Sequence, residues 1–461
     1  MCLIRKNLIF EFMKITKILQ LPLVRNTLKL SSSSALLMLL PLIVTPILSR
    51  LYSPADYGDW GVFSSVFYVV NSFLFLSYEN AIVKSNNEEE VPNLIGICVI
   101  VSSFIILITL LTFTVGQLIG FDFFCNFPSV KLLILLLAAQ AIHIIANNVA
   151  NREKKYGLMS IANIIGGTTQ ASFRVAFGVY PIVAYGLIVG NVIAQVFTTL
   201  FIVICLLRTV QIEWKYLSFK RVVSLAKINK KFPQFDAPAR FVELSLANIA
   251  LIIMTFFWNK SEIGSYSMVT QFVLLPISIV GSSMGNVFYK ELCESAGKPD
   301  IIALTTQRAS KITFMLSFLP LLFFVFGGDY LLTIVLGEKW SSAGSIAICL
   351  CIYSVPLILS EPLLPIFRSL DRQELRFHLN LLNFVLSLGS LFVTAAITHN
   401  LYISLIVYSL FSGFVRYLMY FTILKLANVK LQSVNKHFVI ISIICYVLLF
   451  VRLCFDYPNM I

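Results

Sequence analysis

The sequence predicts an all-α polytopic membrane protein with two parallel-repeat six-helix lobes and one additional C-terminal transmembrane helix. Hydrophobic residues make up 58% of the 461 positions and charged residues only 12%, which leaves too little polar surface to solvate a globule of this size. Apolar runs of membrane-spanning length recur along the chain. A short segment between such runs is written twice, which indicates a duplication.

The duplicated segment reads SPADYGDWGVFSSV at 53–66 and NKSEIGSYSMVTQF at 259–272. Each copy follows one apolar run and opens the next. Four pairs match in residue type at a constant offset of 206 positions: Asp56/Glu262, Gly58/Gly264, Trp60/Tyr266 and Ser64/Thr270. Fourteen positions with few identities could match by coincidence, so the pattern of spans around them carries part of the case.

The apolar runs form two sets of equal size, and a bilayer-spanning helix needs about 20 such residues. The first set is 31–50, 59–83, 93–117, 131–150, 157–180 and 182–206, the second is 237–258, 264–289, 306–326, 342–366, 376–398 and 401–424, and a thirteenth run is 438–455. Because six spans return the chain to its starting side, both copies begin in the same orientation and the repeat is parallel.

These spans divide the chain into five segments. They are a basic interfacial segment at 1–29, an N-lobe at 30–207, a cytoplasmic amphipathic linker at 208–235, a C-lobe at 236–425 and an extra helix at 426–461. The first segment lacks a long apolar core and a cleavage site, which favours an interfacial helix over a signal peptide. The linker mixes basic and aromatic residues, so it fits either an amphipathic helix at the inner headgroups or a docking site for acidic lipids.

The net charge of +13 indicates membrane topology, not nucleic acid binding. Lys and Arg are dispersed in short interhelical segments, without the combined basic and aromatic face of a nucleic-acid-binding surface. Placing the N-terminus in the cytoplasm puts most of these charges on the inner side, as positive-inside topology requires. The outer ends then carry only Arg50, Lys131, Lys260, Lys339 and Arg452.

No residue pattern predicts catalysis, a cofactor or a metal site. The sequence lacks the Gly-rich loop followed by Lys-Ser or Lys-Thr that marks nucleotide hydrolysis. The four His are far apart, the nine Cys lie mostly within apolar runs, and the predicted outer loops are short. The chain is therefore predicted to be a transporter and not an enzyme.

Polar residues at membrane depth are the candidate binding residues, because a charge at the centre of a span costs about 2.5–3.5 kcal/mol and usually faces a cavity or a partner. Asn163, Gln170 and Arg174 lie on one face of the fifth span, and Asn147 belongs to a similar stripe in the fourth. Hydrogen-bonded packing between these helices is the alternative. Arg174 lies roughly 9 Å below the outer end of its helix, which indicates an anionic ligand.

The second half carries a comparable set of charges. Arg416 lies deep within the twelfth span. At the start of the seventh span, Asp236, Arg240 and Glu243 form an acid, base, acid ladder at i, i+4 and i+7. Two interpretations of this ladder remain open: Asp236 caps the helix while Arg240 is neutralised locally, or the three side chains face a cavity.

Two further residue patterns indicate structural roles and not ligand binding. Glu79 and Glu361 lie near inner helix ends and are expected to extend to the headgroups. Small residues spaced four apart indicate close helix packing. These pairs are Gly186/Gly190 and Gly281/Gly285.

Three stretches resemble those of a known family. They are LSRLYSPADYG after the first span, KFPQFDAPARFVE leading into the seventh, and IGSYSMVTQFVLLPISIVGSSMGNVFYKE in the eighth. The chain resembles, over nearly its whole length, the polysaccharide flippases of the multidrug/oligosaccharidyl-lipid/polysaccharide exporter superfamily, which include O-antigen and capsule exporters. The thirteenth span departs from the twelve-helix core of that superfamily and puts the side of the C-terminus in doubt.

The resemblance implies two lobes around a central cavity and a role in lipopolysaccharide or capsule biosynthesis. The substrate would be an undecaprenyl-diphosphate-linked oligosaccharide, moved from the inner to the outer leaflet of the bacterial inner membrane by alternating access. The resemblance also implies association with a polysaccharide polymerase and a chain-length regulator.

The residues and the resemblance agree on one hypothesis for the mechanism. Three arginines, Arg174, Arg240 and Arg416, would offset the desolvation of the diphosphate. Three amides, Asn147, Asn163 and Gln170, would bind the sugars, while membrane lipids surround the polyprenyl tail. Two carboxylates, Asp236 and Glu243, are candidates for a proton or sodium site.

Two other functions fit the sequence less well. A cation-coupled multidrug exporter of the same superfamily would be expected to carry a carboxylate in the first span, and residues 35–50 contain none. A membrane polysaccharide polymerase would be expected to have a large outer catalytic loop and no duplication of lobes.

Overall fold

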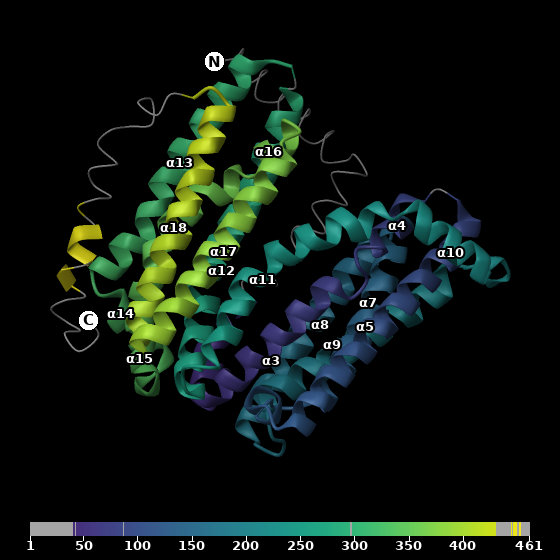
Figure 1. Cartoon of the computed structure of the whole chain (residues 1–461), viewed down its shortest axis with the longest axis horizontal. Helices are drawn as coiled ribbons and strands as arrows, with labels where there is room; N and C mark the ends of the chain where they lie inside the picture. Colours follow the sequence, from purple (N-terminus) through teal and green to yellow (C-terminus); the bar gives the residue numbers. More distant parts are fainter. Residues whose placement is uncertain are drawn as a thin grey trace, which may run out of the picture. The chain divides into compact units, whose positions relative to one another are not determined.

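The fold is given by a computed structural model that describes residues 40–41, 43–85, 87–295, 297–429, 444, 446–449 and 451–452. The expected interfacial segment at 1–29, half of the expected first span and most of the thirteenth lie outside these residues. Every regular element in the described part of the chain is a helix (Figure 1). The prediction of an all-α protein is therefore confirmed.

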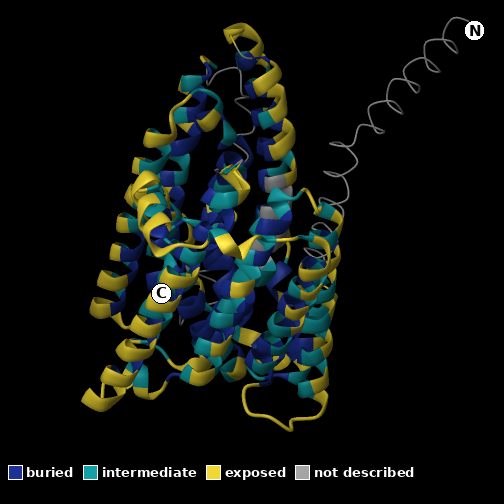
Figure 2. Cartoon of the chain, turned by 90° about the vertical axis from the view of Figure 1, so that its right-hand side faces the viewer, coloured by how far each residue is buried: buried dark blue, intermediate teal, exposed yellow. Residues whose placement is uncertain are grey.

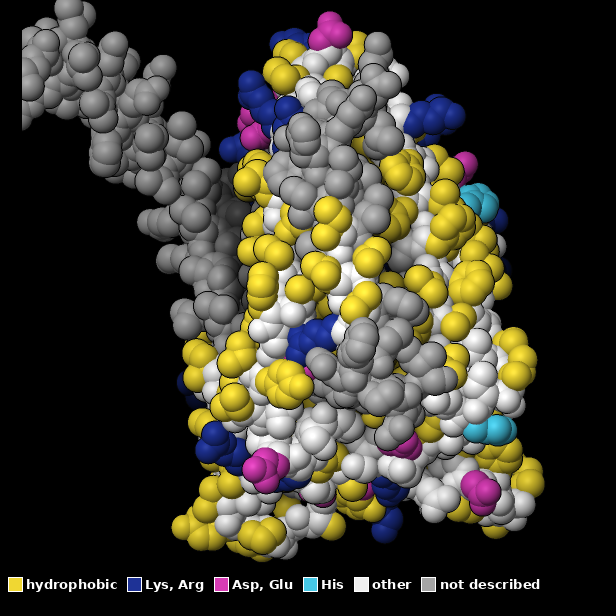
Figure 3. Space-filling model, turned by 90° about the vertical axis from the view of Figure 1, so that its left-hand side faces the viewer, with side chains coloured by type: hydrophobic (Ala, Val, Ile, Leu, Met, Phe, Trp, Pro, Cys, Tyr) yellow, Lys and Arg dark blue, Asp and Glu magenta, His cyan; other side chains and the backbone are white. Residues whose placement is uncertain are grey.

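Seven of the described helices are long and apolar enough to cross a membrane, and an eighth span results if one bent pair is counted as a unit. The seven are Glu88–Ile119, Val130–Arg152, Gly186–Thr209, Pro299–Val325, Glu338–Ser369, Gln373–Thr398 and Leu401–Leu426, and the bent pair is Phe232–Leu246 with Asn248–Met254. On the face drawn in Figure 3, hydrophobic side chains cover the middle and charged side chains lie mostly toward the two ends. The chain is a multi-pass membrane protein.

The chain divides into two compact units, and the first is built mainly from Phe73–Thr114 and Val130–Ala237. Its elements are α4 (Glu79–Lys84), η1 (Glu88–Glu90), most of α5 (Val91–Ile119), α7 (Val130–Arg152), α8 (Tyr156–Val179), α9 (Gly186–Thr209), η2 (Trp214–Tyr216), α10 (Phe219–Ile228) and the π-helical turn η3 (Phe232–Asp236). Helix α9 packs against both α7 and α8. Their shared core consists of Ala146, Ala150, Ala162, Ile202 and Leu206.

The second unit contains Thr45–Ser72, Val115–Ser129 and the described residues from Pro238 onward. Its elements are α3 (Pro54–Phe73), α6 (Asp122–Cys125), α11 (Ala237–Met254), α12 (Lys260–Glu294), α13 (Pro299–Val325), α14 (Gly328–Leu336), η4 (Glu338–Trp340), α15 (Ser341–Ser360), η5 (Glu361–Leu363), α16 (Pro365–Ser369), α17 (Gln373–Thr398) and α18 (Leu401–Leu426). Helix α15 contacts α12, α13, α14 and α18, and nearly all of its residues are buried. Figure 2 colours the chain by burial, with exposed residues on the outer sides of the helices.

For the second to twelfth spans, the helix bounds follow the expected ones except in the second, which was predicted to be continuous over 59–83. Helix α3 ends at Phe73, and α4 begins only at Glu79. Between them, Leu76 and Ser77 have φ of 48° and 64°, in the left-handed region that cannot continue a right-handed helix. The expected single span is thus wrong. The lobe boundaries at 207 and 236 remain predictions.

The linker packs against other helices of the first unit through specific contacts. The Asn93 side chain donates to the Tyr216 carbonyl at 3.0 Å and accepts from the Ser218 N–H at 2.9 Å. The Tyr78 hydroxyl donates to the Ala226 carbonyl at 3.2 Å, and Val222 is the buried residue of α10. The amphipathic helix at the inner headgroups and the docking site for acidic lipids both stay predictions.

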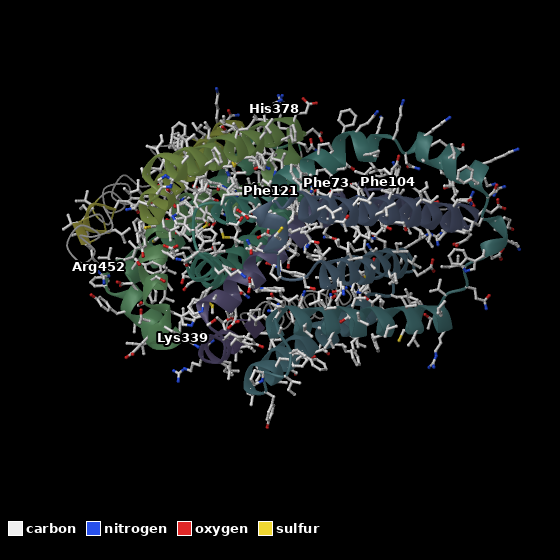
Figure 4. All side chains as sticks on the ribbon, turned by 60° about the horizontal axis from the view of Figure 1, so that its bottom comes forward. Phe73, Phe104, Phe121, Lys339, His378 and Arg452 are labelled. Carbon is white, nitrogen blue, oxygen red and sulfur yellow. The ribbon has the colours of Figure 1, made fainter. Side chains whose placement is uncertain are left out.

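The last described residues pack against other helices of the second unit. The Tyr446 hydroxyl donates to the Ile352 carbonyl of α15 at 2.8 Å. The Arg452 guanidinium contacts the Asp329 carboxylate at 2.7 Å, and this carboxylate is buried at the start of α14. Arg452 (labelled in Figure 4) also donates to the Phe324 carbonyl.

The two copies of the duplicated segment begin their helices in the same way. Before α12, the Asn259 side chain accepts from the Glu262 N–H at 3.0 Å, and the Glu262 carboxylate accepts from the Asn259 N–H at 3.1 Å, which is a capping box. Before α3, Ser53 and Asp56 exchange the equivalent bonds, at 3.2 and 2.8 Å. The offset of 206 positions therefore relates equivalent structures as well as residue types.

The two copies also contact each other within the second unit. A Cβ atom added at Gly58 would lie 2.1 Å from the Lys260 carbonyl oxygen, and one added at Gly264 would lie 1.7 Å from the Pro54 carbonyl oxygen. Pro54 and Lys260 are themselves equivalent in the duplication. The contact is thus made twice by equivalent atoms, as a local two-fold arrangement requires. Only glycine lets the two helix backbones approach this closely.

The segment before α15 holds the same end of α3. Trp340 is fully buried, its indole N–H donates to the Ser49 carbonyl at 2.8 Å, and its ring packs edge-on against Tyr57 at 5.3 Å. The Lys339 ammonium donates to the Arg50 carbonyl at 2.9 Å. The start of α3 is therefore fixed by contacts with both η4 and α12.

The glycine contact predicts a position-specific effect of one methyl group. We expect Gly58→Ala or Gly264→Ala to lower the free energy of unfolding by about 1–3 kcal/mol, because the backbones must separate. Gly389→Ala in α17 is the matched control, since its Cβ would enter open space and would gain up to about 1 kcal/mol of helix propensity. Unfolding of the detergent-purified variants measures the difference. Equal stability of Gly58→Ala and wild type would contradict the contact.

Candidate functional site

Arg174 is the most buried of the predicted binding residues. Its side chain, on α8 in the first unit, is only 8% exposed. Gly190 of α9 makes room for it, since a Cβ at that position would lie 3.1 Å from the Arg174 Cγ. The expected small-residue packing at Gly190 is confirmed. A guanidinium is thus held within the packed α8 and α9 helices of a membrane protein.

The amides predicted to bind sugar lie on α8, the helix that carries Arg174, and on α7. The Gln170 amide, one turn from Arg174, donates to the Asn191 side chain of α9. Asn163 on α8 and Asn147 on α7 are half-buried. The hydrogen-bonded packing proposed for these stripes therefore exists for Gln170, with α9 as the partner helix in place of α7. Binding of sugar by the amides stays a prediction.

Arg416 forms an ion pair that the sequence analysis did not anticipate. Its guanidinium on α18 lies 2.7 Å from the Glu361 carboxylate at the start of η5, and their side chains are 17% and 37% exposed. Gly281 of α12 provides the space, with its added Cβ 3.1 Å from the Glu361 Cγ. Glu361 was expected to extend alone to the headgroups. It instead pairs with an arginine 55 positions later in the chain.

Buried tyrosines lie on α18, which carries Arg416, and on α12 and α15 of the same unit. Tyr353 on α15 and Tyr408 on α18 are buried, and their rings pack edge-on at 6.2 Å. Tyr266 of α12, from the second copy of the duplicated segment, is buried as well. Three helices of the second unit thus each bury a tyrosine.

The predicted ladder at the start of the seventh span does not match the capping interpretation, while the cavity-facing interpretation stays a prediction. Asp236 lies exposed in the π-helical turn that runs directly into α11, so it does not cap that helix. Glu243 pairs at 2.5 Å with Arg376 of α17. Arg240 is half-buried on α11. The Glu243 carboxylate is thus neutralised by a residue of a distant helix, which the local spacing of the ladder could not indicate.

Glu79 is a second carboxylate whose expected position is wrong. It was expected to reach the headgroups, but it is 3% exposed and lies in the first turn of α4. The short helix α4 packs against α7, and the break at 74–78 turns the Glu79 side chain into the unit. A continuous span would have carried it elsewhere.

The partners Asn191, Glu361 and Arg376 are the site residues that sequence reasoning missed. The pairing of Glu361 could have been inferred from the opposite charge of Arg416 in the twelfth span. A lone charge at membrane depth is costly, so two opposite charges in different spans are candidates for an ion pair. Within the described ranges, no group of three His, Cys, Asp or Glu side chains could hold a metal ion.

Comparison with known proteins identifies the family of this chain. A family described as polysaccharide biosynthesis protein matches residues 47–345, more than half of the chain. The chain belongs to the polysaccharide biosynthesis protein family. Teichuronic acid biosynthesis protein TuaB of Bacillus subtilis (strain 168) is 27% identical over 214 residues, which cover 45% of this chain and 44% of TuaB. The match therefore spans less than half of that relative.

Solved structures share the fold of this polysaccharide biosynthesis family member over most of its length. Lipid II flippase MurJ, in an inward closed conformation, has a TM-score of 0.68 at 14% identity and covers 93% of each chain. An inward-facing multidrug resistance MATE family transporter of the MOP superfamily has a TM-score of 0.67 at 14% identity, over 85% of this chain and 94% of that one. The predicted resemblance to this superfamily is confirmed at the level of fold.

The Glu361–Arg416 pair predicts a measurable coupling. We expect a double-mutant cycle of Glu361→Ala and Arg416→Ala to give a coupling of about 1–3 kcal/mol in the free energy of unfolding, because each single change leaves a partly buried charge. Glu213 and Lys215 form the control pair, since they are 2.7 Å apart but mostly exposed, where coupling stays below about 1 kcal/mol. Additive effects of the Glu361 and Arg416 changes would contradict the pairing.

Proposed function

We propose that this polysaccharide biosynthesis protein translocates an undecaprenyl-diphosphate-linked oligosaccharide, an O-antigen or capsule repeat unit, from the inner to the outer leaflet. The proposal depends mainly on one observation, the buried guanidinium of Arg174 in a membrane protein. The MurJ-like fold supports it, because that fold is found in a protein named as a lipid flippase.

The chemistry of the substrate explains why buried arginines are needed. A diphosphate with its sugars cannot enter hydrocarbon without groups that replace its hydration. Arginine binds phosphate oxygens through two parallel N–H bonds, so it is suited to this task. Arg174 and the half-buried Arg240 are the first candidates, while Arg416 would need to exchange Glu361 for the substrate.

The amides and carboxylates are assigned the remaining steps. Asn147, Asn163 and Gln170 would hydrogen-bond the sugars, with Gln170 exchanging Asn191 for a hydroxyl group. Asp236 is the better candidate for a proton or sodium site, because it is exposed. Glu243 could act in the same way only when its pair with Arg376 opens. Lobe rocking would then expose the bound headgroup to the other side.

The proposed setting is the bacterial inner membrane with a cytoplasmic N-terminus. The excess of Lys and Arg in the segments assigned to the inner side supports this orientation. A polysaccharide polymerase and a chain-length regulator are the proposed functional partners, since they would act on the exported unit.

Arg174 provides the direct test of substrate binding. We expect Arg174→Ala to abolish surface polysaccharide at unchanged protein level, and Arg174→Lys to restore it only in part, because lysine keeps the charge but loses the paired geometry. Arg208→Ala is the control, since Arg208 is exposed at the end of α9. Immunoblots of surface polymer and of the tagged protein measure both quantities. Normal polymer with Arg174→Ala would remove this residue from the mechanism.

Deletion of the gene separates translocation from polymerisation. We expect the deletion strain to accumulate lipid-linked repeat units that face the cytoplasm. Loss of a polymerase would instead leave single units displayed outside. The accessibility of the lipid-linked units to an added, membrane-impermeant glycan-oxidising reagent distinguishes these outcomes, and single units outside would contradict the proposed function.

A further inference from the structure

A cavity of about 710 Å³ lies within the second unit, in the range of about 300–1,000 Å³ that small ligands occupy. It is bounded by the start of α3, the segment around α6 and the turn that joins α11 to α12. Its lining includes none of the arginines, amides or carboxylates assigned to translocation above.

Aromatic rings form one wall of this cavity. Phe121 and Phe256 are 50% and 53% exposed, and their rings pack edge-on at 6.3 Å. Phe123 stacks on Phe256 at 5.8 Å with an angle of 25° between the rings. Figure 4 labels Phe121 among the side chains. Two separate segments of the chain thus hold adjoining ring faces that are open to a ligand.

Polar groups line another part of the cavity, beside apolar residues such as Val62, Pro128 and Ile263. Asp59 and Lys260 pair at 2.7 Å, and both line the cavity. Asp122 and Asn126, at the two ends of α6, are exposed and line it as well. Because Lys260 already neutralises Asp59, the carboxylate of Asp122 gives this lining a net negative charge.

We propose that this cavity binds a saccharide unit of the exported glycan. A pyranose ring offers an apolar C–H face and a rim of hydroxyl groups, which match aromatic rings beside carboxylate and amide groups. An acyl chain would offer no hydrogen bond to the Asp122 carboxylate or to the Asn126 amide. A diphosphate would be repelled by the net negative lining, so the sugar is the part of the substrate that fits.

The inference depends on the proposed function and deepens it. The predicted topology assigns the segments around α6 and between α11 and α12 to the outer side. A saccharide site there would hold the glycan after its diphosphate has left the arginines, on the side where the unit is released. The binding energy would then favour movement of the headgroup outward over its return.

Binding of the sugar without its lipid carrier tests the cavity directly. The probe is the oligosaccharide released by mild acid from the host's own lipid-linked intermediates, titrated calorimetrically into the full-length protein in lipid nanodiscs. We expect saturable binding, weakened about fivefold by Phe256→Ala, which corresponds to about 1 kcal/mol. Asp122→Asn should also weaken binding. Phe326→Ala is the control, because Phe326 is exposed at the end of α13 and outside the cavity.

A conservative variant distinguishes loss of binding from loss of folding. Phe256→Tyr keeps a ring of the same shape and should bind as wild type does, whereas misfolding would be detected by size-exclusion chromatography and the unfolding temperature. No saturable binding to wild type, or equal binding to wild type, Phe256→Ala and Asp122→Asn, would overturn the inference.

A second probe separates the sugar from its phosphate. The same oligosaccharide with its diphosphate retained should show the same sensitivity to Phe256→Ala. Sensitivity only in the diphosphate form would overturn the assignment to sugar. Titration requires no translocation, so a protein that binds sugar in the cavity but leaves lipid-linked units unflipped would contradict the proposed function and not this site.

Discussion

The backbones of Gly58 and Gly264 approach so closely that no other residue fits at either position, and much of the second unit depends on this contact. Two capping boxes fix the starts of α3 and α12, and the buried Trp340 holds the start of α3 from another direction. The adjoining cavity is bounded by the same two segments. A wider separation of the α3 and α12 backbones would change the positions of Asp59 and Lys260 in the cavity lining. The two glycines therefore determine the shape of the cavity as well as the packing of these helices.

The second constraint is the cost of charge away from water. The Arg416 guanidinium lies beside the Glu361 carboxylate of another helix, which reduces the cost of burial but also reduces the availability of Arg416 to a ligand. Arg174 is more deeply buried than Arg416. A transporter of an anion needs positive charge that substrate can reach, so the arginines are unequal candidates although the sequence presents them alike.

The helices themselves were predictable from the sequence, because a span must be apolar over about 20 residues and leaves little ambiguity about where it begins and ends. The duplication was predictable too, and equivalent capping residues turned out to make equivalent hydrogen bonds. The break after Phe73 was not predictable. Leu76 and Ser77 adopt left-handed backbone conformations without a glycine or proline to indicate the turn.

The pairings between helices were also beyond sequence reasoning. Glu361 and Arg416 lie in different spans, and Glu243 and Arg376 are 133 positions apart, so local spacing could not connect them. The aromatic wall was missed for the same reason, since Phe121 and Phe256 come from separate connecting segments. A sequence shows which residues are charged or aromatic, whereas the packing of the helices determines which residues become their partners.

The contact between Arg452 and Asp329 has a consequence for recombinant production of the protein. The Asp329 carboxylate is 1% exposed, and its guanidinium partner comes from near the end of the chain. Trimming the final ten residues would take away that positive group and leave negative charge enclosed at the start of α14. An affinity tag added after position 461 keeps the pair, whereas one that replaces the tail would compromise yield and shelf life.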